Sequence, residues 1–147
     1  AMRQAVMSEI AGATVFVGVA AVADYRPVDV AEHKLKKTDS EAAQRGRTIE
    51  LTTNPDILAE VASLPAAPYC VGFAAESQNL DEYAEAKRQR KRLPLIIGNL
   101  VADGLGTSEN RVTLYDDNGR HPLPILPKSE LAQRLVEELA KRLDTAV

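Results

Sequence analysis

Cysteine and long apolar runs are scarce in this sequence. Its single cysteine, Cys70, excludes an internal disulfide, and its place in the run YCVGFAA predicts a small buried hydrophobic side chain. The longest apolar run, about residues 11–23, is too short to span a bilayer, and no basic segment with a small-residue cleavage site precedes it. We therefore expect a cytoplasmic protein that makes no membrane contact.

Glycine-rich phosphate-binding motifs are also missing, because the chain contains neither GxGxxG nor GxxxxGK[ST]. A nucleotide-binding α/β fold normally opens with a strand, a glycine-rich turn and a helix, whereas residues 2–10 have helical spacing of apolar residues. This start indicates either a fragment truncated at its N-terminus or a complete small domain that holds its ligand by other means. A net charge of −3 argues against a nucleic-acid-binding protein.

The composition, with 45% apolar and 27% charged residues, is that of one globular domain over residues 1–147. Apolar runs of strand length alternate with helical patterns. Strands are predicted at 14–20, 48–52, 69–75 and 93–98, and helices at 2–10, 79/80–91 and 128–143. A further helix is predicted to start with Asn54 as its N-cap and Pro55 at its first position.

The two β-α-β units in this pattern predict the α/β class. We expect a Rossmann-like three-layer sandwich, in which helices cover both faces of a mainly parallel sheet. Asp117-Asn118-Gly119 between two alternating segments predicts a C-terminal hairpin. Ligands of such folds bind beyond the carboxyl ends of the strands, which here are residues 20–25, 74–79 and 99–106.

Two basic clusters and one carboxylate could serve a ligand at this edge. Lys34, Lys36 and Lys37 form either a solvated basic loop or a flap that closes over phosphate, and the polar residues 38–46 beside them are expected to be poorly ordered without ligand. Asp24 is either a cap or an acceptor for a ligand's amino or hydroxyl groups.

The second basic cluster is KRQRKR at residues 87–92. Lys87 and Lys91 are four residues apart and share one helix face, and Arg88 and Arg92 share the adjacent one. These faces are either solvated or bind phosphate.

Several sequence blocks taken together are more specific than any of these features. AAVADY, KLKK, NPDIL, VGFAAES, EYAEAKRQRKR and SENRVTL occur in this order over about residues 1–143. In order and spacing they resemble the C-terminal half of bacterial phosphopantothenate-cysteine ligase. The resemblance implies an enzyme of coenzyme A biosynthesis that uses CTP and Mg²⁺ to join 4′-phosphopantothenate to cysteine through an acyl-cytidylate.

The resemblance also implies partners. The ligase family forms homodimers, and the C-terminal hairpin and the strand near Thr48 are candidates for the interface. The parent protein commonly carries a fused flavin-dependent decarboxylase, so that FMN would belong to that domain and not to this chain. An asparagine needed for the acyl-cytidylate lies upstream in the family, and we therefore expect this chain to bind CTP but to be inactive alone.

The resemblance assigns site residues position by position. Lys34 matches the catalytic lysine, Ala21 and Asn99 match substrate-binding positions, and the magnesium ligands are not assigned. The nucleotide-binding positions are Gly18, Val19, Ala20, Asp24, Lys34, Pro55, Asp56, Ile57, Leu58, Phe73, Lys87 and Lys91. Phe73 is alternatively a core aromatic.

One departure from the family and two other readings stand beside this assignment. Gly98-Asn99-Leu100 replaces an Ala-Asn-Asp sequence and loses an acidic position. A non-catalytic nucleotide-binding or protein-interaction domain of the same fold is the alternative function. A dehydrogenase-like domain is disfavoured by the missing glycine motif.

Overall fold

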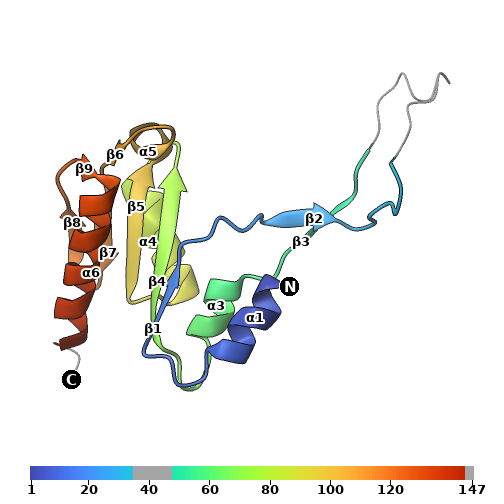
Figure 1. Ribbon diagram of the computed structural model, residues 1–147, viewed down its shortest axis with the longest axis horizontal. Coiled ribbons are helices and arrows are strands. Elements are labelled where there is room, and N and C mark those ends of the chain that lie inside the picture. Colours follow the sequence, from blue (N-terminus) through green and yellow to red (C-terminus); the bar gives the residue numbers. More distant parts are fainter. Residues whose placement is uncertain (35–47, 145–147) are drawn as a thin grey trace.

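The computed structural model describes residues 1–34 and 48–144, and a five-stranded sheet forms its centre (Figure 1). The strand order is β1-β4-β5-β7-β8. The pairs β1–β4 and β4–β5 are parallel, and the pairs β5–β7 and β7–β8 are antiparallel. The strands are β1 (Val15–Gly18), β4 (Tyr69–Glu76), β5 (Leu95–Leu100), β7 (Thr113–Asp116) and β8 (Gly119–Pro122). The expected α/β class and C-terminal hairpin are confirmed.

Helices cover both faces of this sheet. The helices α1 (Met2–Glu9), α3 (Ile57–Ala62) and α4 (Leu80–Lys91) pack on one face, and α6 (Lys128–Asp144) packs on the other. The side chains of β4 and β5 alternate between these layers because successive residues of a strand point to opposite faces. The expected three-layer sandwich is therefore confirmed.

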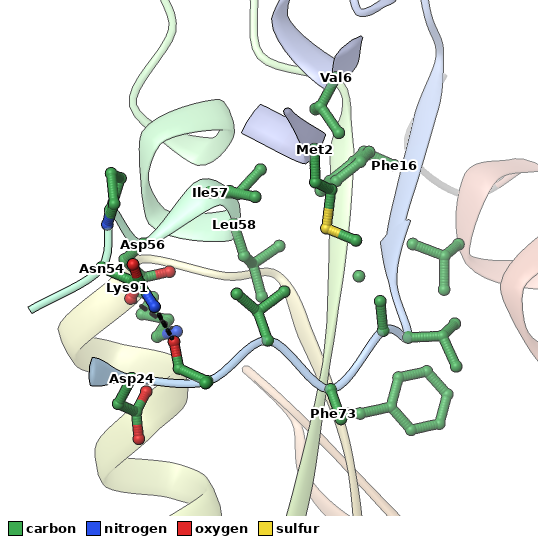
Figure 2. Close-up of a pocket in the computed structure, with 18 of the residues that line it drawn as sticks. Met2, Val6, Phe16, Asp24, Asn54, Asp56, Ile57, Leu58, Phe73 and Lys91 are labelled. Carbon is green, nitrogen blue, oxygen red and sulfur yellow. Dashed lines mark hydrogen bonds and ion pairs between the residues drawn. The ribbon is translucent and has the colours of Figure 1, made fainter. Parts of the chain in front are cut away.

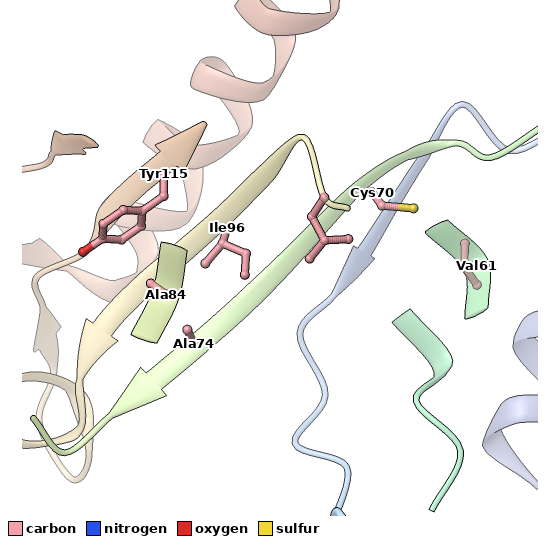
Figure 3. Packing of buried hydrophobic residues seen from close by; sticks show 7 residues of the cluster. Val61, Cys70, Ala74, Ala84, Ile96 and Tyr115 are labelled. Atoms are coloured by element: carbon pink, nitrogen blue, oxygen red, sulfur yellow. The ribbon is translucent and has the colours of Figure 1, made fainter. Parts of the chain in front are cut away.

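The core shows this alternation residue by residue. Cys70, Ala74 and Ile96 join the cluster under α1, α3 and α4 (Figure 3), whereas Val71 and Leu95 pack towards α6. Cys70 is buried as predicted, and burial raises the pKa of its thiol above the ordinary value. This places Cys70 in the core and makes it a poor nucleophile at neutral pH.

The start of α3 differs from the prediction. Its N-cap is Asp56, whose side chain accepts a hydrogen bond from the backbone N–H of Ala59 at 3.1 Å. Asn54 and Pro55 lie before the helix, so the predicted cap at Asn54 is wrong. The reason is tertiary, because the Asn54 side chain forms hydrogen bonds to another segment.

The predicted strand at 48–52 also differs from the structure. The strand β3 (Leu51–Thr53) does not join the main sheet, but pairs antiparallel with β2 (Tyr25–Pro27). We call residues 25–34 and 48–53 the arm, which projects from the rest of the molecule (Figure 1). Lys36, Lys37 and the predicted flap at 38–46 lie outside the described residues.

The hairpin turn lies within the predicted residues 117–119. Asp116 pairs with Gly119, which leaves Asp117 and Asn118 as the turn residues. Of residues 116–119, only Gly119 has a positive φ, 109°, which favours glycine at this position. The remaining elements are α5 (Val101–Gly104) and the pair β6 (Glu109–Asn110) with β9 (Leu126–Pro127). Within the described residues, no helix has both the length and the apolar character needed to cross a membrane.

Candidate functional site

A cleft of about 520 Å³ lies at the carboxyl ends of β1 and β4 (Figure 2). Three parts of the chain supply most of its lining: residues 18–24 at and after the end of β1, residues 54–58 at the start of α3, and the cleft-facing side of α4. We call the first the β1 segment and the second the α3 segment. The cleft lies where the parallel strands predicted it, because their carboxyl ends meet at one edge of the sheet.

Nearly all of the sequence-predicted nucleotide positions line this cleft. They are Gly18, Val19, Ala20, Asp24, Pro55, Asp56, Ile57, Leu58, Phe73, Lys87 and Lys91. The predicted substrate position Ala21 lines it as well. Phe73 lines the cleft and also packs against the core cluster on the α6 side.

Two predicted site residues do not line the cleft. Lys34 is exposed and lies on the arm, beyond β2. Asn99 lies in β5 beside Ala75, and its side-chain Nδ2 donates to the carbonyl of Leu100 at 2.9 Å. Asn99 therefore lies at the same edge of the sheet as the cleft but outside the cavity. Lys34 lies outside the cavity because it is on the arm.

An ion pair lies at the polar end of the cleft. The Nζ of Lys91 lies 2.7 Å from Oδ2 of Asp56, with the Lys91 side chain 14% exposed and the Asp56 side chain 47% exposed. Burial acts to raise the pKa of Asp56, but the hydrogen bonds from Lys91 and from the Ala59 N–H outweigh it and hold the pKa below its usual range. Asp56 is therefore ionised at neutral pH.

Lys87 is the second cation of the cleft. Its Nζ donates to the carbonyl of Phe73 at 3.0 Å. Burial is the main cause that lowers its pKa, and the neighbouring charge of Lys91 adds to it, while Glu76 and Asp24 act in the opposite direction. An anionic ligand would relieve both unfavourable effects, because it supplies negative charge between two close ammonium groups.

The helical spacing of α4 explains why these two lysines meet. Lys87 and Lys91 are one turn apart and both point into the cleft. Arg88 instead points to the hairpin, where it donates to Glu85 at 2.9 Å and to Asp117 at 2.8 Å. Arg92 ends the helix with a φ of 54°. Of the basic cluster, only the Lys87 and Lys91 face is available to a cleft ligand.

The opposite end of the cleft is apolar. Met2 and Val6 of α1 and Phe16 of β1 line it together with Ile57 and Leu58 (Figure 2). Sequence reasoning did not assign the first three to the site. The signal was the four-residue spacing of Met2 and Val6, which indicates a buried helix face but not a ligand.

Asn54 was predicted to cap α3, but its hydrogen bonds reach the β1 segment and the arm instead. Its side-chain Nδ2 donates to the carbonyl of Ala23 at 2.8 Å, and its backbone N–H donates to the carbonyl of Asp24 at 2.7 Å. Its Oδ1 accepts a hydrogen bond from Nη1 of Arg26 at 3.0 Å. Asn54 thus joins the β1 segment to the α3 segment.

The site can hold an anion together with an apolar or aromatic group. A divalent cation fits only in part, since no group of three or more His, Cys, Asp or Glu side chains is placed to hold a metal within residues 1–34 and 48–144. Mg²⁺ is commonly bound by one or two carboxylates together with substrate phosphates. Asp24 lines the cleft and supplies one such carboxylate.

Comparisons with known proteins identify the family of the chain. Residues 1–143 match the model of the DNA/pantothenate metabolism flavoprotein C-terminal domain family. The coenzyme A biosynthesis bifunctional protein CoaBC of Vibrio cholerae is 42% identical over 92% of this chain and 34% of its own length. The Escherichia coli (strain K12) protein of the same name is 42% identical over 97% of this chain and 36% of its own length.

Solved structures give the same result for the fold. The C-terminal domain of a coenzyme A biosynthesis bifunctional protein CoaBC matches with a TM-score of 0.74 and 30% identity, over 98% of this chain and 62% of that one. A DNA/pantothenate metabolism flavoprotein from Streptococcus pneumoniae has a TM-score of 0.72 at 17% identity, over 95% of this chain and 66% of that one, and supports the fold alone.

The chain spans about a third of the length of the curated relatives. The matches confirm the resemblance inferred from the sequence blocks. The chain belongs to the DNA/pantothenate metabolism flavoprotein C-terminal domain family.

Proposed function

We propose that the cleft binds CTP, and that the chain is the nucleotide-binding part of a ligase that joins 4′-phosphopantothenate to cysteine in coenzyme A biosynthesis. The observation that carries the proposal is the convergence on one cleft of segments that are far apart in the sequence. The family resemblance assigned residues 18–20 with Asp24, residues 55–58, Phe73 and the Lys87–Lys91 pair to the nucleotide, and all of them line one cavity.

The polar end of the cleft suits the triphosphate. Lys87 and Lys91 present two ammonium groups, and Lys87 is held in place by the Phe73 carbonyl. Charge-assisted hydrogen bonds to phosphate are about twice as strong as neutral ones. We infer that the base and ribose lie along the α3 segment and Phe73, where apolar surface adjoins backbone polar groups.

The reaction proposed for the whole ligase has two steps. The carboxylate of 4′-phosphopantothenate attacks the α-phosphate of CTP, which forms an acyl-cytidylate and releases pyrophosphate. The amine of cysteine then attacks the acyl carbon, which forms the amide and releases CMP. The first step brings a carboxylate against a triphosphate, and the lysines of α4 offset this repulsion by fixing positive charge near the phosphates.

Magnesium would complement this arrangement. Asp24 is the cleft carboxylate that would help to hold it, and the ion would supply further neutralisation of the phosphate charge. The residues of the chain itself orient the nucleotide and keep its phosphates next to the two cations.

We further propose that the arm forms part of a homodimer interface and thereby brings Lys34 to an active site. Tyr25, Val28, Val30 and Leu51 are exposed on the arm although they are apolar or aromatic. A two-stranded ribbon is marginally stable alone and needs a covering surface. A second copy of the chain would cover it, and sedimentation analysis at several concentrations tests this association.

The test of nucleotide binding is calorimetric titration of this chain with CTP, ATP and GTP in the presence of Mg²⁺. We expect the lowest Kd for CTP, and little or no amide product when 4′-phosphopantothenate and cysteine are added. The Lys87→Gln/Lys91→Gln variant serves as the control, because it removes both cleft cations. Equal affinity for the three nucleotides would contradict the proposal.

A further inference from the structure

Two of the segments that line the cleft are separated in the sequence by the arm. The β1 segment ends at Asp24, where the arm begins, and the α3 segment begins at Asn54, where the arm ends. Asp24 lines the cleft from the first segment and Asp56 from the second. The width of the cleft therefore depends on how the two segments are joined at the base of the arm.

Asn54 makes the hydrogen bonds at this junction. Its Nδ2 reaches the carbonyl of Ala23 at 2.8 Å, and its backbone N–H reaches the carbonyl of Asp24 at 2.7 Å. In the part of the chain that the structure describes, every hydrogen bond between the β1 segment and the α3 segment involves Asn54. Figure 2 shows Asn54 beside the Asp56–Lys91 pair, with Asp24 on the neighbouring β1 segment.

Arg26 determines which way the Asn54 amide points. Its Nη1 donates to Asn54 Oδ1 at 3.0 Å and to the carbonyl of Thr53 at 2.8 Å. With the oxygen engaged by a cation, the amide nitrogen must face Ala23, because the two ends of the amide have opposite hydrogen-bonding roles. Arg26 thus acts on the cleft through Asn54.

We propose that Asn54 is a positioning residue that sets the separation between the Asp24 side and the Asp56–Lys91 side of the cleft, and that Arg26 orients it. The inference rests on the proposed nucleotide binding and extends it to two residues to which that proposal assigns no contact with the nucleotide. A ligand that contacts both segments binds tightly only if the segments are already held at the correct separation. Otherwise part of the binding free energy is spent on ordering the two segments.

The experiment compares four variants of this chain: Asn54→Ala, Arg26→Ala, the double variant, and Asn118→Ala. Asn118 is an exposed asparagine of the hairpin turn and serves as the matched control outside the cleft. For each variant we would measure the Kd for CTP with Mg²⁺ by calorimetry, the Tm, and hydrogen–deuterium exchange of residues 19–25.

We expect Asn54→Ala to raise the Kd for CTP by roughly 3- to 10-fold, the range of one lost neutral hydrogen bond. Its Tm should stay close to that of the wild type, since the core clusters do not include Asn54. Exchange of residues 19–25 should accelerate, while exchange in β4 and β5 should not. Asn118→Ala should change none of these quantities.

The Kd of the Arg26→Ala variant distinguishes a positioning role of Asn54 from a purely structural one. If Arg26 acts through Asn54, its removal raises the Kd in the wild-type chain but adds nothing in the Asn54→Ala background. If Arg26 instead contacts the triphosphate directly, the two effects add, and this outcome overturns the orienting role. Arg26→Ala also keeps the test decisive if Asn54→Ala does not fold, because it leaves Asn54 in place.

The outcomes also separate this inference from the proposed function. If the wild-type chain does not bind CTP, the proposed function is overturned. If the wild-type chain binds CTP and Asn54→Ala changes neither the Kd nor the exchange of residues 19–25, the positioning role is overturned. Exchange that accelerates in residues 19–25 supports the junction independently of any nucleotide.

Discussion

The ammonium group of Lys91 lies 2.7 Å from the carboxylate of Asp56, and that carboxylate also accepts the backbone N–H of Ala59. One side chain therefore caps α3 and ties it to the last turn of α4. The pair also places Lys91 at the polar end of the cleft.

The first prediction separates the two roles of Asp56. Asp56→Ala removes the helix cap and the ion pair, and we expect the free energy of unfolding to fall by about 1 to 2 kcal/mol. Asp56→Asn keeps the capping oxygen and loses only a half-exposed pair, so its loss should stay below about 1 kcal/mol. Urea denaturation of both variants measures the difference. Equal losses would mean that the ion pair, and not the cap, carries the stabilisation.

The second prediction concerns the lysines. Lys87→Gln and Lys91→Gln should each raise the Kd for CTP by about 10- to 150-fold, the range of one charge-assisted hydrogen bond. Lys34→Gln should change the Kd by less than about 3-fold, because Lys34 does not line the cleft. Calorimetry of the three variants decides this. Arg90→Gln is the matched control, since Arg90 is an exposed cation of the same helix.

The catalytic expectation for Lys34 needs the full-length ligase. There Lys34→Gln should lower kcat by on the order of 10²-fold while the KM for CTP changes less, as expected for an interaction made in the transition state. Pyrophosphate release and amide formation report the two steps. A variant with wild-type turnover would show that Lys34 belongs to a solvated loop.

The third prediction concerns Gly98, where the resemblance to the family led us to expect alanine. A Cβ at this position would lie 2.9 Å from Leu80 Cδ1 and 2.9 Å from Tyr115 Cε2. The Tyr115 ring cannot move aside easily, because its hydroxyl donates to Asp81 at 2.6 Å. We expect Gly98→Ala to lower the free energy of unfolding by about 1 to 3 kcal/mol.

A second variant and a control test that explanation by urea denaturation. In the Tyr115→Leu background the cost of Gly98→Ala should shrink, since the ring is gone. Gly18→Ala should be tolerated, because its Cβ would meet no atom closer than 3.5 Å. A cost that stays undiminished in the Tyr115→Leu background would exclude the ring as the obstacle.

The fourth prediction is a pH dependence at Asp116. Burial acts to raise the pKa of this carboxyl, but His121, the Asn118 N–H and Arg142 together hold it below its usual range. Because the folded-state pKa lies below that of the unfolded chain, the stabilisation is present above about pH 4 and is lost as the pH falls through the folded-state pKa.

Asp116→Asn should therefore lower stability at pH 7 by about 1 to 3 kcal/mol. The difference from the wild type should shrink as the pH falls below about 4. Urea denaturation at a series of pH values measures this. Asp29→Asn, an exposed carboxylate on the arm, is the control and should show no such trend. A difference that stays constant down to about pH 2 would contradict the linkage.

Much of the fold could be predicted because it depends on local patterns. The run 69–75 predicted β4 almost to the residue, and α4 begins at Leu80 as expected. Lys87 and Lys91 were predicted to share a face because the helical repeat places residues four apart side by side. The hairpin was predicted from its turn residues, and the turn lies at Asp117 and Asn118.

The arm and the junction at Asn54 could not be predicted in the same way. Residues 48–52 alternate like a half-buried strand, but whether such a strand joins the main sheet depends on partners distant in the chain. Asn54 has the residue type and position of a helix cap, yet it bonds to Ala23 and Asp24, which only the folded chain brings near. Asp56 then became the cap.

The sequence by itself determined the α/β class and the helices and strands of the core, because apolar periodicity acts over short stretches of chain. Most of the residues that line the cleft were assigned from the resemblance of the sequence blocks to the family. Only the tertiary structure decided that the cleft has an apolar end at Met2, Val6 and Phe16, and that Lys34 lies away from it. These features depend on contacts between segments separated by the arm, and no local pattern encodes the distance between such segments.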